Sequence, residues 1–223
     1  MLAKLTQSAA PLDDATLARA SHALVVLPFS RQLDSFRGVP GMGGLEAVLA
    51  RRAMKAEELA KTPVTLSLPA GGLCAFVMLD AGRTPFERFT ALRRALAPLM
   101  EEQPRELCLA VFGSAEVRRE CAREALYVAW LNGARLPTRK RKPETRSLRR
   151  IRLHGARDAG GYAEIETLVA GNLLARELTA LPPNELTPVL LARTRSRGQG
   201  PSAPAGAPSR SNPASSPGTA AIP

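Results

Sequence analysis

The fold class is decided by residues 73–112, which read LCAFVMLDAGRTPFERFTALRRALAPLMEEQPRELCLAVF. The stretch begins with an apolar run at Leu73 to Leu79 and ends with another at Glu106 to Phe112, and both have the length of buried strands. Between them, Thr84-Pro85 combines an N-cap residue with proline at the first helical position. The helix that follows has an apolar stripe at 3.6-residue spacing, made of Phe86, Phe89, Leu92, Leu96 and Leu99. This order of strand, helix and strand predicts part of a parallel α/β sheet.

The same alternation continues upstream. His22 to Phe29 is an apolar run typical of a buried strand, and Gly41-Met42-Gly43-Gly44 leads into a helix. The apolar positions of that helix are Leu45, Val48, Leu49, Ala53, Ala56 and Leu59. Pro63 to Leu68 predicts another strand, and the turn Pro69-Ala70-Gly71-Gly72 joins it to the strand that begins at Leu73 as a hairpin.

Downstream, Ser114 is the expected N-cap of a helix from Ala115 to about Asn132, with an apolar side that includes Val117, Cys121, Leu126 and Trp130. Leu148 to Leu153 predicts a last strand. Asp158-Ala159-Gly160-Gly161 introduces a long helix from about Tyr162 to Leu181, with Ile165, Leu168, Val169 and Leu173 on one side. The pattern predicts an α/β domain with a mixed, largely parallel sheet and helices on both faces.

The net charge of +11 belongs to two local segments. Residues 135–152 contain nine basic residues and one acid, Glu144, and residues 193–223 contain four arginines and no acid. The rest of the chain is therefore close to neutral. No apolar stretch reaches the 18 residues of a membrane span, and the first residues lack the apolar centre of a secretory signal.

The three cysteines, Cys74, Cys108 and Cys121, lie far apart in strand-like or helical runs. This spacing does not suit a metal site and favours buried, reduced thiols, which predicts a cytoplasmic protein. The two histidines, His22 and His154, have no partner at metal-ligand spacing, so structural or surface positions are the better interpretation.

The last 31 residues, 193–223, contain six prolines, four glycines, six serines and six alanines. Such a composition cannot bury enough apolar surface to offset the entropy of ordering, so we expect a disordered tail. This tail directly follows a helix start at Thr187-Pro188. A helix start that leads at once into low-complexity sequence is a local contradiction. Our hypothesis is that the tail is the product of a frameshift in GC-rich DNA, or of a premature divergence, near Ala192 or Arg193.

The junction before this tail resembles one known family. The residues Ala170-Gly171-Asn172-Leu173-Leu174-Ala175-Arg176-Glu177-Leu178 are followed by Leu181-Pro182-Pro183-Asn184-Glu185-Leu186-Thr187-Pro188. This pattern is similar to the leucyl (cytosol) aminopeptidase family, in which a linker helix ends in a Pro-Pro-Asn turn and enters the catalytic domain through a Leu-Thr-Pro helix start. The close resemblance covers about 30 residues, with Pro182, Pro183, Asn184, Thr187 and Pro188 as the motif. The upstream pattern is compatible with the macro-like N-terminal domain of that family.

The resemblance implies a homohexameric enzyme that removes N-terminal residues from peptides with two divalent metal ions, Zn or Mn. Those ions need clustered carboxylates, but this chain has five aspartates in total and no acid after Glu185. The family's Asn-Thr-Asp-Ala-Glu-Gly-Arg-Leu signature and its Gly-Lys-Gly segment are also missing from the sequence. No catalytic or metal-binding residue can be carried over. We therefore expect a truncated family member that does not catalyse, with the α/β domain at 1–157, the linker helix and first catalytic-domain residues at 158–192, and the tail at 193–223.

The alternative interpretation is a stand-alone α/β module that binds nucleic acid or a nucleotide through the basic segment 135–152. Its candidate contacts are Arg139, Lys140, Arg141 and Lys142, which could neutralise phosphates. The sequence has no aromatic residue between Trp130 and Tyr162 for base stacking, so a solvated loop or a subunit contact is the simpler interpretation. The loop Gly41-Met42-Gly43-Gly44 lacks a phosphate-binding spacing, and Ser114 and Cys108 lack a base. We interpret the glycine loop as a helix entrance, Ser114 as a helix cap and Cys108 as a core residue.

Overall fold

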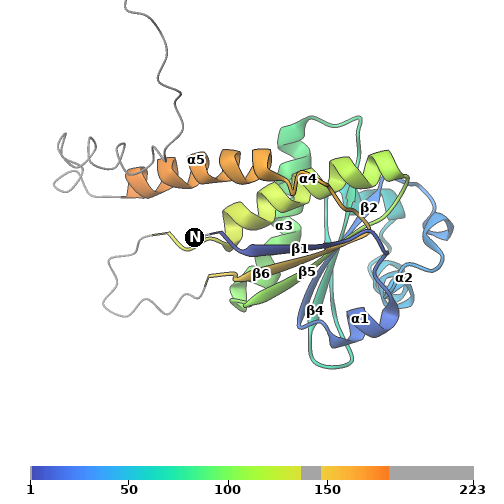
Figure 1. Cartoon of the computed structure of the whole chain (residues 1–223). Helices are drawn as coiled ribbons and strands as arrows, with labels where there is room; N and C mark the ends of the chain where they lie inside the picture. Colours follow the sequence, from blue (N-terminus) through green and yellow to red (C-terminus); the bar gives the residue numbers. More distant parts are fainter. Residues whose placement is uncertain (1, 137–146, 181–223) are drawn as a thin grey trace, which may run out of the picture. The chain divides into compact units, whose positions relative to one another are not determined.

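The computed structural model describes residues 2–136 and 147–180 (Figure 1). By its contacts the chain divides into two compact units, Met1–Leu181 and Pro182–Pro223. The described residues all belong to the first unit. The expected disordered tail and the junction motif belong to the second, and they lie outside the described residues.

The centre of the first unit is a six-stranded sheet in the order β1-β6-β5-β2-β4-β3. Its strands are β1 (Lys4–Ser8), β2 (His22–Pro28), β3 (Val64–Ser67), β4 (Leu73–Leu79), β5 (Glu106–Val111) and β6 (Arg150–His154). All neighbouring pairs are parallel except β3 and β4, which form the expected hairpin, with Val64 opposite Phe76. The predicted α/β class with a mixed, largely parallel sheet is confirmed.

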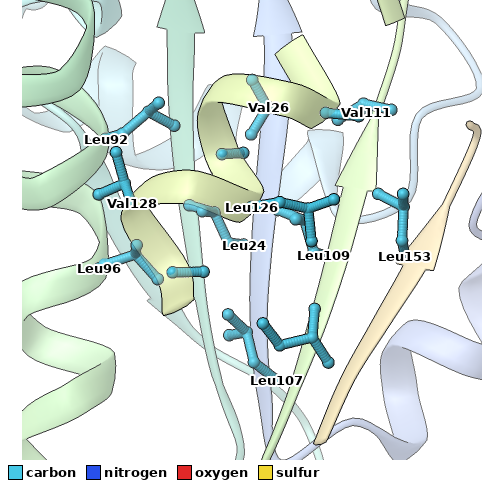
Figure 2. Packing of buried hydrophobic residues seen from close by; sticks show 14 of the residues in the cluster. Leu24, Val26, Leu92, Leu96, Leu107, Leu109, Val111, Leu126, Val128 and Leu153 are labelled. Atoms are coloured by element: carbon cyan, nitrogen blue, oxygen red, sulfur yellow. The ribbon is translucent and has the colours of Figure 1, made fainter. Parts of the chain in front are cut away.

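Helices cover both faces of the sheet, as predicted (Figure 1). They are α1 (Asp14–Arg19), α2 (Met42–Arg51), α3 (Pro85–Glu101), α4 (Ala115–Gly133) and α5 (Ala163–Ala180), with short 3-10 helices η1 (Leu33–Phe36) and η2 (Ala56–Ala60). On one face, α3, α4 and α5 bury alternate strand residues such as Leu24 and Leu109. Figure 2 shows the side chain of Leu126 on α4 meeting these two leucines. On the other face, α1, α2 and η2 cover the intervening residues, among them Val25 and Phe76.

The local signals that start the helices act as the sequence predicts. The Thr84 hydroxyl accepts from the backbone N–H of Glu87, and the Glu87 carboxylate accepts from the backbone N–H of Thr84, which forms a capping box before α3. The Ser114 hydroxyl accepts from the backbone N–H of Val117 and caps α4. Each cap satisfies backbone donors that a helix start otherwise leaves unpaired.

The single helix expected from Leu45 to Leu59 is wrong. The α-helix α2 ends at Arg51, and the chain reverses through Ala53, whose φ is 51°. A residue in this left-handed conformation cannot continue a right-handed helix. The chain then forms η2, which buries Leu59 as a separate element. Apolar spacing alone did not distinguish one helix from two that pack on the same face.

Two residues of the predicted apolar stripes face solvent. Phe86 is 79% exposed and Leu168 is 58% exposed. In α3 the buried residues include Leu92 and Leu96, and Phe86 lies roughly 120° around the helix from Leu92 at about 100° per residue. In α5 only Ile165 and Val169 are buried, because this helix packs on α4 along a narrow side. Leu168 falls outside that contact.

Sequence reasoning missed the strand β1 and the helix α1, and it placed the start of β6 two residues too early. Within the described residues the strand β1 pairs with β6 alone, with Lys4 opposite Arg150 and Ser8 opposite His154. In the described part of the chain, no helix combines the length and the apolar character needed to cross a membrane.

Candidate functional site

A hollow of the described domain lies where the strand order changes direction. After β2 the chain turns to α2 on one face of the sheet, and after β5 it turns to α4 on the other face. Because β2 and β5 are neighbours, their carboxyl ends open onto a crevice between the two outgoing connections. Open α/β sheets bind ligands at such a position. A pocket of about 440 Å³ occupies it here.

The pocket has apolar walls and few polar groups. Its lining is Pro28, Phe29, Ser30, Ser35, Phe36, Arg37, Gly38, Val39, Phe112 and Gly113. The Ser30 hydroxyl donates to the backbone oxygen of Gln32 at 2.9 Å. Arg37 is the one charged side chain of this lining, and it is largely exposed and paired with Asp34 at 3.2 Å. Since the lining contains no carboxylate, histidine or cysteine, its chemistry suits binding and supplies no acid, base or nucleophile.

The carboxylates of the described domain are dispersed, and several of them are paired with arginines. Glu124 receives both Nε and Nη2 of Arg88, at 2.6 to 3.0 Å, and this bond raises the pKa of Arg88. Glu164 contacts Arg123 at 2.8 Å. Within residues 2–136 and 147–180, no group of three histidine, cysteine or acidic side chains could hold a metal ion. The described residues therefore do not fit the two divalent ions that the family resemblance implies.

The three cysteines are buried and none forms a disulfide. Burial raises the pKa of Cys74 and of Cys121 to about 12 and that of Cys108 to about 11. The thiolate is the reactive form of cysteine, so burial makes these thiols inert. The placement of Cys74 and Cys108 in strands and of Cys121 in a helix agrees with the prediction.

These thiols should not react while the chain is folded. At about pH 8 we expect a disulfide-exchange reagent to modify none of the three cysteines, and to modify all of them in denaturant. The variant Ala170→Cys, at an exposed position of α5, is the control and should react at once. Because unfolded thiols ionise near pH 9 and the folded ones do not, the free energy of unfolding should fall as the pH rises above about 9. Rapid modification of the folded wild-type chain would contradict the assignment.

Both histidines have structural surroundings. His22 is buried at the start of β2, and its Nε2 lies 2.8 Å from the Glu102 carboxylate at the end of α3. His154 lies at the end of β6, where burial and the charge of Arg152 lower its pKa. The predicted helix entry at Gly41 is also observed. Gly41 has a φ of 80°, and a Cβ there would lie 3.1 Å from the Phe76 ring. The position therefore favours glycine for a packing reason.

Other residues singled out in the sequence lie outside the described residues. They are the basic residues Arg139, Lys140, Arg141 and Lys142, and the junction residues Pro182, Pro183, Asn184, Thr187 and Pro188. Sequence reasoning in turn missed the crevice, because its walls come from two strands that are neighbours only in space. The sequence signal that could have found the crevice is that Phe29 and Phe112, which both line it, each directly follow an apolar strand.

Comparison with known proteins relates the fold to aminopeptidases. No model of a protein family matches the sequence, and no curated protein matches it either. Among solved structures, a mutant of tomato leucine aminopeptidase matches with a TM-score of 0.63 and 20% identity, over 88% of this chain and 42% of that chain. The bottromycin maturation enzyme BotP in complex with Mn matches at 0.53 and 18%, over 80% and 36%. The cytosol aminopeptidase from Coxiella burnetii matches at 0.51 and 12%, over 86% and 36%. This chain thus spans about two-fifths of the length of these structures, and the likeness is one of fold.

Proposed function

We propose that this chain is a non-catalytic member of the leucyl aminopeptidase family. It carries the macro-like α/β domain and the linker helix of that family, without the centre that would bind two divalent metals and hydrolyse peptides. The observation that carries the proposal is the fold likeness to leucine and cytosol aminopeptidases over 88% and 86% of this chain. The Pro-Pro-Asn and Thr-Pro junction, at the spacing of that family, supports the same relationship.

The chemical reason for the absence of catalysis is the distribution of carboxylates. A two-metal hydrolase holds its ions about 3.5–4 Å apart with several shared acidic ligands. In the described domain no group of three histidine, cysteine or acidic side chains could hold a metal ion, and after residue 180 the sequence contains a single acid, Glu185. The buried, reduced thiols support a cytoplasmic location. We expect these 223 residues to be monomeric, because the hexamer that the family resemblance implies forms largely through catalytic domains, whose signature this sequence does not contain.

A direct assay tests the proposal. The full chain, purified without metal and then supplied with Mn or Zn, should release no amino acid from leucyl peptides or leucyl anilides. An intact leucine aminopeptidase in the same buffer is the positive control. Light scattering during gel filtration should give the mass of one chain. Metal-dependent release of leucine would overturn the proposal, provided that the activity is lost with a chelator and co-elutes with the monomer.

A further inference from the structure

We propose that the amino-terminal ends of β1, β5 and β6 form a binding surface for duplex nucleic acid, which contacts phosphates and reads no base sequence. The surface is a basic cluster of five described residues, Lys4, Arg105, Arg149, Arg150 and Arg152. All five residues belong to the described domain, and none of them lies in the segment 137–146. The surface does not depend on an aminopeptidase relationship.

Sheet pairing brings these cations together from three distant parts of the chain. Lys4 on β1 and Glu106 on β5 both lie opposite Arg150 on β6. The Lys4 N–H donates to the backbone oxygen of Arg149 at 2.8 Å, and the Arg149 N–H donates to that of Arg105 at 2.9 Å. In Figure 1 the start of β1, the start of β6 and the end of α4 lie side by side. The hydrogen-bonded backbone thus fixes the spacing of the charges.

One face of this part of the sheet is open. Lys4, Thr6 and Arg150 are exposed, and the side chain of Arg152 keeps 43% of its surface accessible. The alternate residues Ile151 and Leu153 point to the other face and are buried in the core with α4. Residues two apart in a strand are about 6.6 Å apart, so Arg150 and Arg152 present charges along a straight row. The side chains of Lys4, Arg150 and Arg152 therefore lie on this face, whereas Arg105 and Arg149 directly precede β5 and β6 at the edge of the sheet.

The charge of the cluster is only partly compensated. Glu106 is shared by Arg150, at 3.0 Å, and by Arg152. No carboxylate of the described residues forms an ion pair with Lys4, Arg105 or Arg149. Among the described residues, the five cations of the cluster thus have a single carboxylate, that of Glu106, as an ion-pair partner. A surface with uncompensated positive charge attracts a polyanion.

The chemistry of the surface favours a duplex over other polyanions. Single-stranded binding sites add aromatic side chains on which bases stack, and none of the cluster residues is aromatic. Membrane-surface binding adds an amphipathic helix with an apolar face, whereas these residues lie on strands and beside them. A duplex presents phosphates at high density and is bound by cations alone, with about 0.9 counterions released per contact. The cluster supplies cations, which a duplex requires, and it lacks the aromatic side chains or the amphipathic helix that the other two ligands require.

The test compares two variants of equal charge. The full chain is titrated against a fluorescein-labelled duplex of about 20 base pairs, two helical turns, with NaCl from about 50 to about 200 mM. Lys4→Gln, Arg105→Gln and Arg149→Gln are combined in the cluster variant. Arg51→Gln, Arg52→Gln and Arg93→Gln, all exposed elsewhere, form the control variant. Circular dichroism verifies that both variants fold. Both keep every charge of segments 137–146 and 193–223.

We expect the cluster variant to bind at least tenfold more weakly at about 100 mM salt, with the slope of log affinity against log salt reduced by about 2.7. The control variant should stay within about threefold of wild type. Equal losses in the two variants would show that net charge alone attracts the duplex and would overturn the proposal. Absence of salt-dependent duplex binding by the wild-type chain, or tighter binding to vesicles of anionic lipid than to the duplex, would overturn it as well.

Discussion

Replacing Gly155 by alanine should lower the free energy of unfolding by about 3 kcal/mol or more, whereas Gly161→Ala should cost about 1 kcal/mol. Both glycines have a positive φ, 88° at Gly155 and 70° at Gly161, which an alanine adopts only with strain. They differ in their surroundings. A Cβ at Gly155 would overlap the backbone oxygen of Val111, and a Cβ at Gly161 would meet no atom within 4 Å. The pair therefore separates steric overlap from backbone strain.

The overlap cannot be relieved cheaply, because Gly155 is held on two sides. Its N–H donates to the backbone oxygens of Ser8 at 3.0 Å and Ala10 at 2.9 Å, which connects the end of β6 to the segment that follows β1. Moving Gly155 away from β5 would stretch these bonds, and moving Val111 would disturb the end of β5, next to the pocket-lining residues Phe112 and Gly113.

Urea unfolding followed by circular dichroism measures both variants against wild type. A loss of about 3 kcal/mol corresponds to a fall of roughly 6–12 °C in Tm for a domain of this size. Equal losses for Gly155→Ala and Gly161→Ala would contradict the packing at the end of β5.

The strands and helices with strong local signals could be predicted from the sequence. The capping box at Thr84 and the N-cap at Ser114 act within three residues, and β2, β4 and β5 are apolar because both of their faces are buried. Buried central strands of this kind carry the clearest composition signal. The α/β class followed from these elements alone.

The edge of the sheet could not be predicted in the same way. The strand β1 is exposed on one face and contains Lys4, Thr6 and Ser8, so its five residues carry no continuous apolar run. Among the described strands its only partner is β6, which follows all the others in the sequence. The basic cluster depends on this pairing, because Lys4 and Arg150 become neighbours only when the sheet order is known. The crevice between β2 and β5 could not be predicted for the same reason, because these two strands become neighbours only when the sheet order is known.

Trp130→Ala should be the most destabilising change, with a loss of about 3–5 kcal/mol in the free energy of unfolding. Trp130 lies on α4, its side chain is 1% exposed, and it is among the largest fully buried side chains. Its indole Nε1–H donates to the backbone oxygen of Ala3 at 2.9 Å, which fastens α4 to the chain just before β1. Truncation therefore leaves a cavity in the core and also removes the donor for a buried carbonyl group.

Trp130→Phe separates these two effects. Phenylalanine fills much of the space but cannot donate, so we expect an intermediate loss of about 1–3 kcal/mol. Because Trp130 is the only tryptophan of the chain, unfolding of the variants must be followed by circular dichroism. A typical domain has 5–15 kcal/mol of stability, so Trp130→Ala should leave a folded but strongly weakened protein. If the alanine variant lost less than about 1 kcal/mol, α4 would not hold β1 in the way described. The basic cluster, which includes Lys4 on that strand, would then lose its structural support.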